Sequence, residues 1–479
     1  MVDPLRLEVL HPAPLHPAGR YVLLWMVGNR RIGFNPALEH AVDRARELGR
    51  PLVVLEALRH DYPWATARSH HFGLAGMADL APRFARAGVA HYRYVEPAPG
   101  AARGLLEGLA ADACLVVTDL TPSFFFPSMR AAAARRISRR IEAVDGVGLL
   151  PVKVAGRGYL RAFDFRGMLA RELPTHLGRR PRANPLTGDL PRVALDTPGL
   201  IDPRILARWA PSPPVPTLPT GLDTRVGPAA QPGGETAALT ALARFLPHAD
   251  GWIEDGRHPD RNRTSRLSPW LHWGHLSTWA VLEALENHAS VDATFGLQAF
   301  PEPLAKFLDE LVTWRELAQN GAAYLPHYDR YEGQPAWARA TLEKHAADHR
   351  PVLYDPDALA GASTHDPLWN AAQRQLVEQG WMHNQLRMLW GKKVLEWSPS
   401  PAEGFATLLD LNNRYALDGR DPSSVAGVAW VFGRYDRAWG PERPIFGMVR
   451  YMTSASMQRK LEVKRIMAGA ATPATPAWD

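Results

Sequence analysis

The sequence predicts an N-terminal α/β domain with a Rossmann-like parallel sheet, followed by an all-α domain. Two patterns indicate this division. Short apolar runs alternate with helical patterns in the first 160 residues, whereas helical patterning without alternation resumes at Glu235 and persists toward the C-terminus. The length agrees, because a chain of 479 residues exceeds the size at which a single hydrophobic core stops growing.

The α/β domain is expected over residues 1–160. Its strands are predicted at residues 21–27, 51–55 and 114–118, and its helices at residues 37–48, 69–87, 101–111 and 128–143. Strands that alternate with helices form parallel sheets covered on both faces, whose ligands lie beyond the carboxyl ends of the strands. The first strand is followed by GNRRIGFNPAL and not by a GxGxxG sequence, so a nicotinamide dinucleotide is not the expected ligand.

The rest of the chain divides where the composition changes. Residues 161–234 are expected to form an interdomain linker, because the chain after about residue 173 is rich in proline and has no sustained period. The helical domain is expected over residues 235–467. The last residues, 468–479, are predicted to be a disordered tail.

Composition narrows the possible functions. Cys114 is the only cysteine, which rules out intramolecular disulfides and cysteine-rich metal sites, so no metal is expected and a reducing cytoplasm fits. No stretch has the length of a membrane span and the N-terminus does not resemble a secretory signal, so we expect a soluble protein, taken as a monomer. A net charge of +6 is compatible with a polyanionic partner but does not establish one.

Four tryptophans mark residues 366–397, which the apolar spacing predicts to be two buried helices separated near Gly380. They are Trp369, Trp381, Trp390 and Trp397. The ordinary interpretation is core packing, although four large aromatics are unusual for one helix pair. Downstream, the LDGRDP loop holds carboxylates that need partners, and Arg387 is expected to form a buried ion pair with Asp418.

Two further segments carry candidate functional side chains. In TSRLSPWLHWG, hydroxyl groups and backbone amides precede a helix expected to begin near Pro269, which favours either anion binding or a plain helix cap. In FLDELVTWRELAQN, Glu310 and Trp314 are four residues apart and share one face of a predicted helix. An exposed glutamate beside a core tryptophan is the ordinary alternative.

These segments resemble the photolyase and cryptochrome superfamily, and most closely the class II cyclobutane pyrimidine dimer photolyases. The resemblance rests on THDPLWNAAQ, LRMLWGKKVLEW, LNNRYALDGRDP and ERPIFGMVRYM, which follow one another in order and cover most of the C-terminal half, together with TSRLSPWLHWG. The N-terminal half is similar in layout more than in wording. The resemblance implies light-driven repair of cyclobutane pyrimidine dimers by electron transfer from excited reduced FAD, with UV-damaged DNA as the partner.

The resemblance also implies which residues hold FAD in the helical domain. Asn412 matches the family residue that faces the flavin N5, and the pair of Arg387 with Asp418 is expected beside the reacting edge. The chain that passes electrons to the flavin is expected to be Trp390, Trp369 and Trp397, in that order outward. The remaining predicted FAD-binding residues are Trp252, Thr264, Ser265, Arg266, Leu267 and Ser268.

The same resemblance places the pyrimidine dimer beside Glu310, which would bond to the edge of the base, and Trp314, which would stack against it. Further predicted contacts to the lesion and to DNA are Met388, Trp430, Arg437, Arg443 and Arg450. Lys392 and Lys393 are expected either to neutralise phosphates or to belong to a solvated helical face.

The sequence departs from the family pattern at positions that bear on either ligand. Trp252 stands where the family usually has a flavin-contacting tyrosine, and Asn384 with Gln385 replaces a glycine and an aromatic residue. Tyr435 in place of a histidine and Met448 in place of a lysine bear on DNA binding.

Other functions remain open. A cryptochrome-like blue-light photosensor would keep FAD and the tryptophan chain without repair, and a flavoprotein that has lost light chemistry would not need the chain. The N-terminal domain is expected to bind a deazaflavin, a folate or no second chromophore at all.

Overall fold

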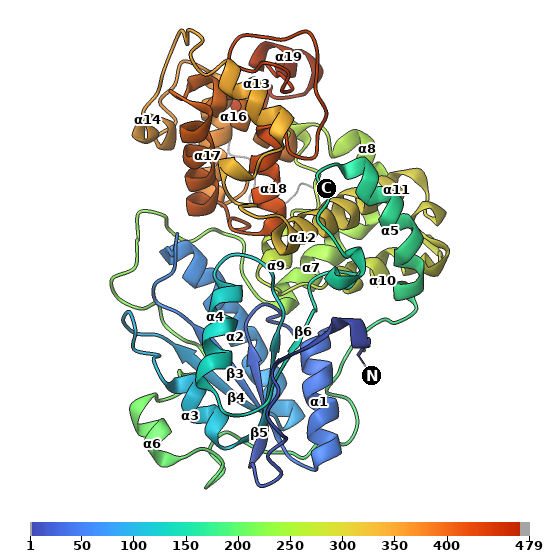
Figure 1. Ribbon diagram of the computed structural model, residues 1–479, viewed down its shortest axis with the longest axis vertical. Helices are drawn as coiled ribbons and strands as arrows, with labels where there is room; N and C mark the ends of the chain where they lie inside the picture. The colour runs from blue at the N-terminus through green and yellow to red at the C-terminus, as the bar shows by residue number, and fades with distance from the viewer. Residues whose placement is uncertain (1, 470–479) are drawn as a thin grey trace.

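The computed structural model describes residues 2–469, so most of the predicted tail lies outside the described residues. The N-terminal domain contains one six-stranded sheet with the strand order β1-β6-β5-β2-β3-β4 (Figure 1). Its strands are β1 Leu7–His11, β2 Tyr21–Met26, β3 Leu52–Leu58, β4 Ala90–Val95, β5 Ala113–Asp119 and β6 Ile141–Val144. All neighbours pair in parallel except β1, which pairs antiparallel with β6 at the edge. The expected Rossmann-like parallel sheet is therefore confirmed.

The helices of this domain are α1 Pro36–Leu48, α2 Ala67–Ala87, α3 Leu105–Ala111 and α4 Phe126–Arg136. The sheet separates two hydrophobic cores, and alternate side chains of the fully buried β2 enter different ones. Val22 and Leu24 belong to one core, whereas Leu23 and Trp25 belong to the other. This two-sided burial is what a central parallel strand requires.

The sequence pattern misses β1, β4 and β6. The helix predicted at residues 128–143 is wrong in its C-terminal part, because α4 ends earlier and Ile141–Val144 forms β6. The spacing of Ile137, Ile141 and Val144 fits a helix, but Ile141–Val144 is fully buried and pairs in parallel with β5. This long-range pairing overrides the local pattern.

The described chain after β6 contains helices and no strand, as expected from residue 235 onward. Its helices are α5 Ala162–Leu177, α6 Pro203–Arg208, α7 Glu235–Phe245, α8 Trp252–Asp255, α9 Ser268–His272, α10 Thr278–Ala289, α11 Glu302–Leu308, α12 Arg315–Tyr324, α13 Ala336–Lys344, α14 Pro356–Ala360, α15 Pro367–Gln379, α16 Asn384–Trp397, α17 Pro401–Tyr415, α18 Pro422–Val431, α19 Ser454–Lys460 and α20 Lys464–Met467. Gly380, with a φ of 67°, ends α15 in the left-handed conformation. The predicted break between the two tryptophan-bearing helices is thereby confirmed.

The segment 161–234 holds more regular structure than a linker implies. α5 occupies its beginning and packs through Phe165 into the core of the helical domain. The rest of the segment runs along the α/β domain, where the Val193 N–H donates to the Gly88 carbonyl oxygen at 2.8 Å. The segment thus contacts both domains.

Two properties of the described residues bear on function. No helix within residues 2–469 combines the length and the apolarity that crossing a membrane requires. The same residues contain no group of three or more His, Cys, Asp and Glu side chains arranged to hold a metal ion. Cys114 is buried in β5 as a free thiol.

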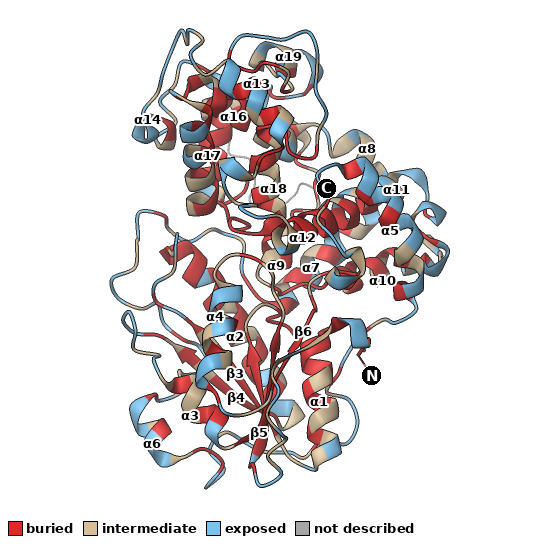
Figure 2. Ribbon diagram, viewed as in Figure 1, coloured by how far each residue is buried: buried red, intermediate tan, exposed pale blue. Residues whose placement is uncertain are grey.

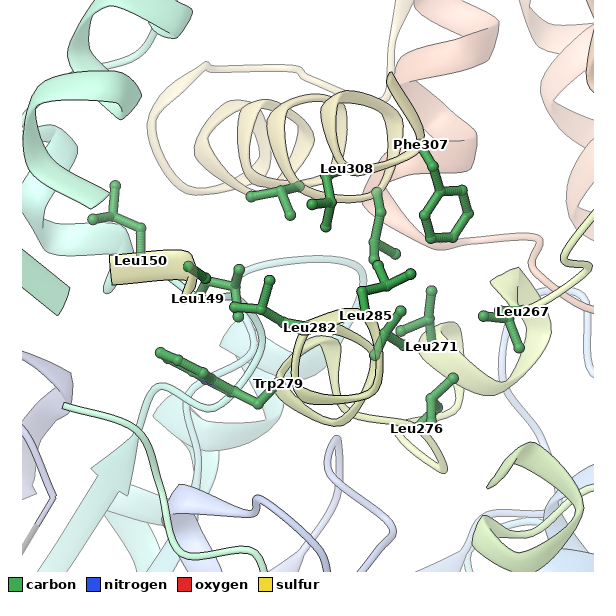
Figure 3. Packing of buried hydrophobic residues seen from close by; sticks show 14 of the residues in the cluster. Leu149, Leu150, Leu267, Leu271, Leu276, Trp279, Leu282, Leu285, Phe307 and Leu308 are labelled. Atoms are coloured by element: carbon green, nitrogen blue, oxygen red, sulfur yellow. The ribbon is translucent and has the colours of Figure 1, made fainter. Parts of the chain in front are cut away.

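The two domains share a hydrophobic core at their junction, where buried segments of both meet (Figure 2). Leu149 and Leu150, which follow the last strand, lie beside Trp279 and Leu282 of α10 (Figure 3). All four side chains are buried. Because such apolar packing removes a large surface from water, it stabilises one relative position of the domains.

A buried carboxylate fastens the same junction. Glu316 of α12 accepts hydrogen bonds from the N–H groups of Leu149 at 2.6 Å and Leu150 at 3.4 Å. The backbone approaches so closely that a Cβ atom at Gly148 would lie 2.3 Å from a Glu316 carboxylate oxygen. Burial, assisted by the charge of Asp145 and opposed by the Leu149 and Leu150 N–H groups and by Arg6, raises the pKa of Glu316 to about 7.

This raised pKa predicts a pH dependence of stability. The unfolded chain releases the Glu316 proton near its ordinary pKa of 4.5, whereas the folded protein keeps it until about 7. The free energy of unfolding should therefore fall as the pH rises through this window, by roughly 3 kcal/mol from this group. In Glu316→Gln this contribution is absent. In urea denaturation, the free energy of unfolding of the variant relative to that of the wild type should be higher at about pH 8 than at about pH 5. Equal differences at both pH values would contradict the raised pKa.

Candidate functional site

The centre of the helical domain is organised around the buried carboxylate of Asp421 at the start of α18. Its Oδ2 lies 3.3 Å from Arg315 Nη1 and 3.3 Å from His272 Nδ1, and its Oδ1 accepts the Ser423 N–H at 2.8 Å. Burial raises the pKa of Asp421, but Arg315, His272 and the Ser423 N–H outweigh burial and hold it well below its usual range. Asp421 therefore joins α9, α12 and α18.

Asp418, three residues earlier, forms the ion pair predicted with Arg387. Arg387 Nη2 donates to Asp418 Oδ1 at 3.1 Å and Arg387 Nη1 donates to Asp418 Oδ2 at 3.3 Å. The two side chains are only 15% and 9% exposed, so the contact is shielded from water and charge-assisted. The pair is confirmed, whereas its place beside a flavin stays a prediction.

Asn412 of α17 is held in one orientation by its neighbours. Its Nδ2 donates to Asn413 Oδ1 at 3.0 Å, and its Oδ1 accepts the Ser424 hydroxyl at 3.0 Å. Asn413 Oδ1 also accepts the Arg420 N–H at 2.8 Å. One N–H of the Asn412 amide makes no hydrogen bond within the described residues, so a buried amide with a fixed direction retains a donor for a ligand.

The segment before α9 is built for a polar ligand more than for capping the helix. The N-cap residue is Leu267, and no side chain caps α9, so the interpretation of a plain helix cap is wrong. The Thr264 hydroxyl is buried and has no hydrogen-bond partner among the described residues. Arg266 has a φ of 50° and lies with its guanidinium 3.8 Å from the centre of the Trp381 ring. A buried hydroxyl without a partner is costly unless a ligand or water satisfies it.

The remaining predicted cofactor residues surround this segment. Ser265 is partly exposed, and Ser268 is the first residue of α9. Trp252 of α8 packs edge-on against Phe245, with ring centres 6.0 Å apart, and against Phe307 at 5.0 Å. Trp252 thus stands in an aromatic cluster and retains partial exposure.

Three tryptophans of α15 and α16 form a continuous chain of rings. The ring centres of Trp390 and Trp369 are 6.5 Å apart and nearly parallel, and those of Trp369 and Trp397 are 5.5 Å apart. Trp390 Nε1 donates to Gln373 Oε1 at 2.9 Å, and Trp369 Nε1 donates to the Trp390 carbonyl oxygen at 3.0 Å. The predicted order of the three rings is therefore confirmed, and their electron-transfer role stays a prediction.

The outer end of this chain reaches the surface. Trp397 lies 5.3 Å from the ring of Tyr354 and 5.4 Å from the ring of His365, measured between ring centres. The Tyr354 hydroxyl is 2.7 Å from His365 Nδ1. His365 is exposed, so aromatic contacts continue from the buried Trp390 to solvent.

Glu310 and Trp314 lie on a π-helical segment, Asp309–Trp314, between α11 and α12. π-helical turns are rare and occur frequently at functional sites. Glu310 is exposed, yet the surrounding protein and the charge of Asp309 raise the pKa of its carboxyl. Trp314 is partly exposed, with the Arg166 guanidinium 5.5 Å from its ring centre. Both side chains are thus open to a ligand.

A second partly exposed indole, Trp430, lies at the end of α18. Arg450 lies 5.4 Å from its ring centre and 3.9 Å from that of Trp439. Arg450 also pairs with Asp436 at 2.9 Å. Arg437, which is exposed, lies 4.3 Å from the Trp439 ring centre. Indoles and guanidinium groups therefore alternate outward from Trp430.

Two other predicted contacts lie near this array. Met388 packs against α18, since a Cβ atom at Gly427 would lie 3.9 Å from Met388 Cε. Gly427 and Trp430 are three residues apart and so share a face of α18. Arg443 is exposed, 5.1 Å from the ring centre of Tyr451.

The structure corrects the expectation for the two lysines of α16 and for one departure from the family pattern. Lys392 is fully buried and Lys393 is 9% exposed, so neither phosphate contact nor a solvated face describes them. Tyr435 is also buried, with its N–H donating to the Leu160 carbonyl oxygen, and does not reach DNA directly. Apolar packing of α16 on α17 and α18 explains the burial of the lysines.

The other departures lie nearer the surface. Met448 is partly exposed and accepts the Trp439 N–H through its carbonyl oxygen at 2.8 Å. Asn384 is exposed at the start of α16, and Gln385 beside it is partly exposed.

A cavity of about 590 Å³ lies between the carboxyl ends of β2, β3 and β5 and the helical domain. Sequence reasoning missed its lining, which includes Arg30, Phe124, Phe125, Trp273 and Arg420. The signal in the sequence was FFF, which begins five residues after a buried strand, at the edge where such sheets bind ligands. Trp273 lines this cavity and also contacts the segment that carries Asp418, because its Nε1 donates to the Leu417 carbonyl oxygen at 3.3 Å.

Known proteins resemble this chain over nearly its whole length. It is 34% identical to the deoxyribodipyrimidine photo-lyase of Methanothermobacter thermautotrophicus, over 93% of this chain and 93% of that protein. It is 34% identical to the enzyme of the same name from Oryza sativa subsp. japonica, over 96% of this chain and 88% of that protein. Cryptochrome-1 of Gallus gallus is 31% identical, but over 35% of this chain and 26% of that protein.

The crystal structure of a bacterial class III photolyase from Agrobacterium tumefaciens superimposes with a TM-score of 0.67, over 94% of this chain and 86% of that one. At 19% sequence identity this likeness shows the fold alone. No protein-family model matches the chain. The full-length relatives above 30% identity, together with the fold, establish that the chain belongs to the photolyase and cryptochrome superfamily.

Proposed function

We propose that this protein is a deoxyribodipyrimidine photo-lyase that repairs cyclobutane pyrimidine dimers in DNA, in the manner of the class II enzymes. The observation that carries the proposal is the π-helical segment that presents Glu310 and Trp314 to solvent on the same domain as the tryptophan chain. A sensor needs the chain of rings alone, whereas a lesion-binding enzyme also needs accessible stacking surfaces. The names of the relatives that match over most of both chains support the same function.

The helical domain fits FAD. The Thr264 hydroxyl needs a partner, and the backbone amides at the start of α9 suit a diphosphate. The pair of Arg387 with Asp418 offers polar recognition for a ring edge, and Asn412 offers an N–H of fixed direction. FAD in its reduced, light-excited form supplies the electron that splits the dimer. The residues position it and connect it to solvent through Trp390, Trp369 and Trp397.

Aromatic side chains and charged groups form the proposed binding site for the pyrimidine dimer. A dimer flipped out of the duplex exposes flat faces that stack on indoles, here Trp314 and Trp430, with Met388 beneath. The Glu310 carboxyl, whose pKa is raised chiefly by burial, suits hydrogen bonding to the edge of a base. Arg437, Arg443 and Arg450 form the basic rim that contacts phosphates.

The interdomain cavity is the proposed place for an antenna chromophore. Its aromatic side chains suit a flat ring system, and Arg30 and Arg420 each lie within 5.9 Å of the Trp273 ring centre. Deazaflavin and folate both satisfy these requirements. An absorption spectrum of the purified protein distinguishes them, because the bands of each chromophore add to those of FAD.

The function is tested by repair. Protein with fully reduced FAD should restore dimer-containing oligonucleotide under blue light and leave it unchanged in the dark. Trp314→Ala should lower the preference for damaged over intact DNA about tenfold, because stacking contributes on the order of 1–3 kcal/mol per base. The control Arg443→Ala should weaken binding to both DNAs alike, since it contacts phosphate. Tight binding of the dimer with no repair in the light would favour the photosensor function instead.

The flavin site is tested by a double-mutant cycle on Arg387 and Asp418. Arg387→Met or Asp418→Asn alone should weaken FAD retention about tenfold or more, because each leaves a shielded charge without its partner. The double variant should lose less than the sum of the two single variants. Dissociation constants from flavin fluorescence provide the measurement. Strictly additive losses would mean that the two residues do not act as a pair.

The tryptophan chain is tested by photoreduction of oxidised FAD with an external reductant. Trp390→Phe retains most of the ring volume but removes the more easily oxidised indole, so the rate should fall at least about tenfold. Trp279→Phe serves as a matched control, because Trp279 is equally buried in the interdomain core and outside the chain. Unchanged photoreduction in Trp390→Phe would show that the three rings only fill the core.

A further inference from the structure

Lys392 of α16 is a buried cation without an ion-pair partner among the described residues. It is 0% exposed, and its ammonium donates to the Val431 carbonyl oxygen at 2.5 Å. Its neighbour Lys393 pairs with Glu396 at 2.7 Å. A buried charge is costly unless neighbouring groups compensate it.

The Lys392 ammonium lies directly against a lesion-side indole. Its Nζ is 4.8 Å from the ring centre of Trp430, a cation–π distance. Trp430 is only partly buried, and the ammonium of Lys392 contacts its ring together with Arg450, 5.4 Å from the ring centre, and the apolar core. The backbone carbonyl of the next residue, Val431, fixes the ammonium in this position.

Lys392 is also the inner end of the array described above. The order outward is Lys392, Trp430, Arg450, Trp439 and Arg437, with neighbouring cation and ring centre 3.9 to 5.4 Å apart. Asp436 joins the outer members, since it accepts hydrogen bonds from Arg450 Nε at 2.9 Å and Trp439 Nε1 at 3.1 Å. The array leads from a buried cation to an exposed one, and Trp430 is its first accessible ring.

We propose that Lys392 is a positioning residue for lesion recognition, whose buried ammonium holds the Trp430 indole in the orientation that receives the pyrimidine dimer. The inference rests on the proposed repair function and deepens it. Lys392 does not touch DNA, because it has no exposed surface. It acts through Trp430 and so affects the recognition of the lesion more than the binding of phosphates.

The protonation of Lys392 gives this role a pH signature. Burial lowers the pKa of Lys392 to about 7, the charge of Asp436 acts in the opposite direction, and that of Arg450 acts in the same direction. Lys392 is therefore charged below about pH 7 and neutral above it. The cation–π attraction between Lys392 and Trp430 weakens as the pH rises through this value. An arginine at this position stays protonated throughout.

The test measures dark binding of the flavin-loaded protein to a dimer-containing duplex and to the same duplex without the dimer, between about pH 6 and about pH 8.5. The ratio of the two affinities should fall with rising pH in the wild type. Lys392→Met, neutral and similar in length, should have a ratio about fivefold lower at low pH and no pH dependence. Lys392→Arg, where it folds, should keep the high ratio and lose the pH dependence.

A stability measurement separates positioning from folding. Lys392→Met removes a buried charge and should unfold at an equal or higher urea concentration than the wild type. A variant that is at least as stable yet recognises the lesion less well cannot owe the loss to a damaged fold. If the ratio in Lys392→Met equals that of the wild type at every pH, the inference is wrong. If the wild type itself does not prefer damaged DNA, the proposed function fails instead.

Discussion

The helical domain depends on a buried carboxylate that cannot lose its partners. Asp421 is held by Arg315 and His272, which come from two other helices. Arg315 directly follows the π-helical segment that carries Glu310 and Trp314, and His272 ends α9. Because an unpaired charge in this position would cost several kcal/mol, these segments must keep one relative geometry. The segment suited to a diphosphate and the segment suited to a lesion are thereby fixed on one frame.

The tryptophans of this domain differ in their electrostatic surroundings. The N–H groups of Trp390 and Trp369 donate to neutral oxygens, and no lysine or arginine of residues 2–469 lies over either ring. Trp397, at the outer end of the chain of rings, has Lys393 Nζ 5.5 Å from its ring centre. Trp430 and Trp439 lie against cations. A nearby positive charge opposes the removal of an electron from a ring and favours the ring as a binding surface. By this criterion Trp390 and Trp369 are the rings from which an electron is removed more easily, and Trp430 and Trp439 are better placed as binding surfaces.

Patterns in the sequence predicted those structural features that the residue types themselves determine. Gly380 interrupts the apolar spacing of its segment and ends α15 in the left-handed conformation, and Arg387 and Asp418 could be matched because a buried carboxylate needs a cationic partner. The burial of Lys392 could not be predicted, because only the packing of α16 between other helices removes it from water. The π-helical geometry of Asp309–Trp314 has no signature in residue spacing. Strand β4 was not predicted because its sequence contains the polar residue His91. In the structure His91 Nε2 lies 3.0 Å from Glu56 of the adjacent strand, a partner that is distant in sequence.

We propose that one helical domain holds FAD and a flipped pyrimidine dimer side by side. A crystal structure of the flavin-loaded protein with a dimer-containing duplex tests this proposal. We expect the diphosphate of FAD at Thr264, the flavin ring beside Asn412 and the Arg387–Asp418 pair, and the dimer against Trp314 and Trp430. A dimer that remains stacked within the duplex, or a flavin bound away from these residues, would contradict it.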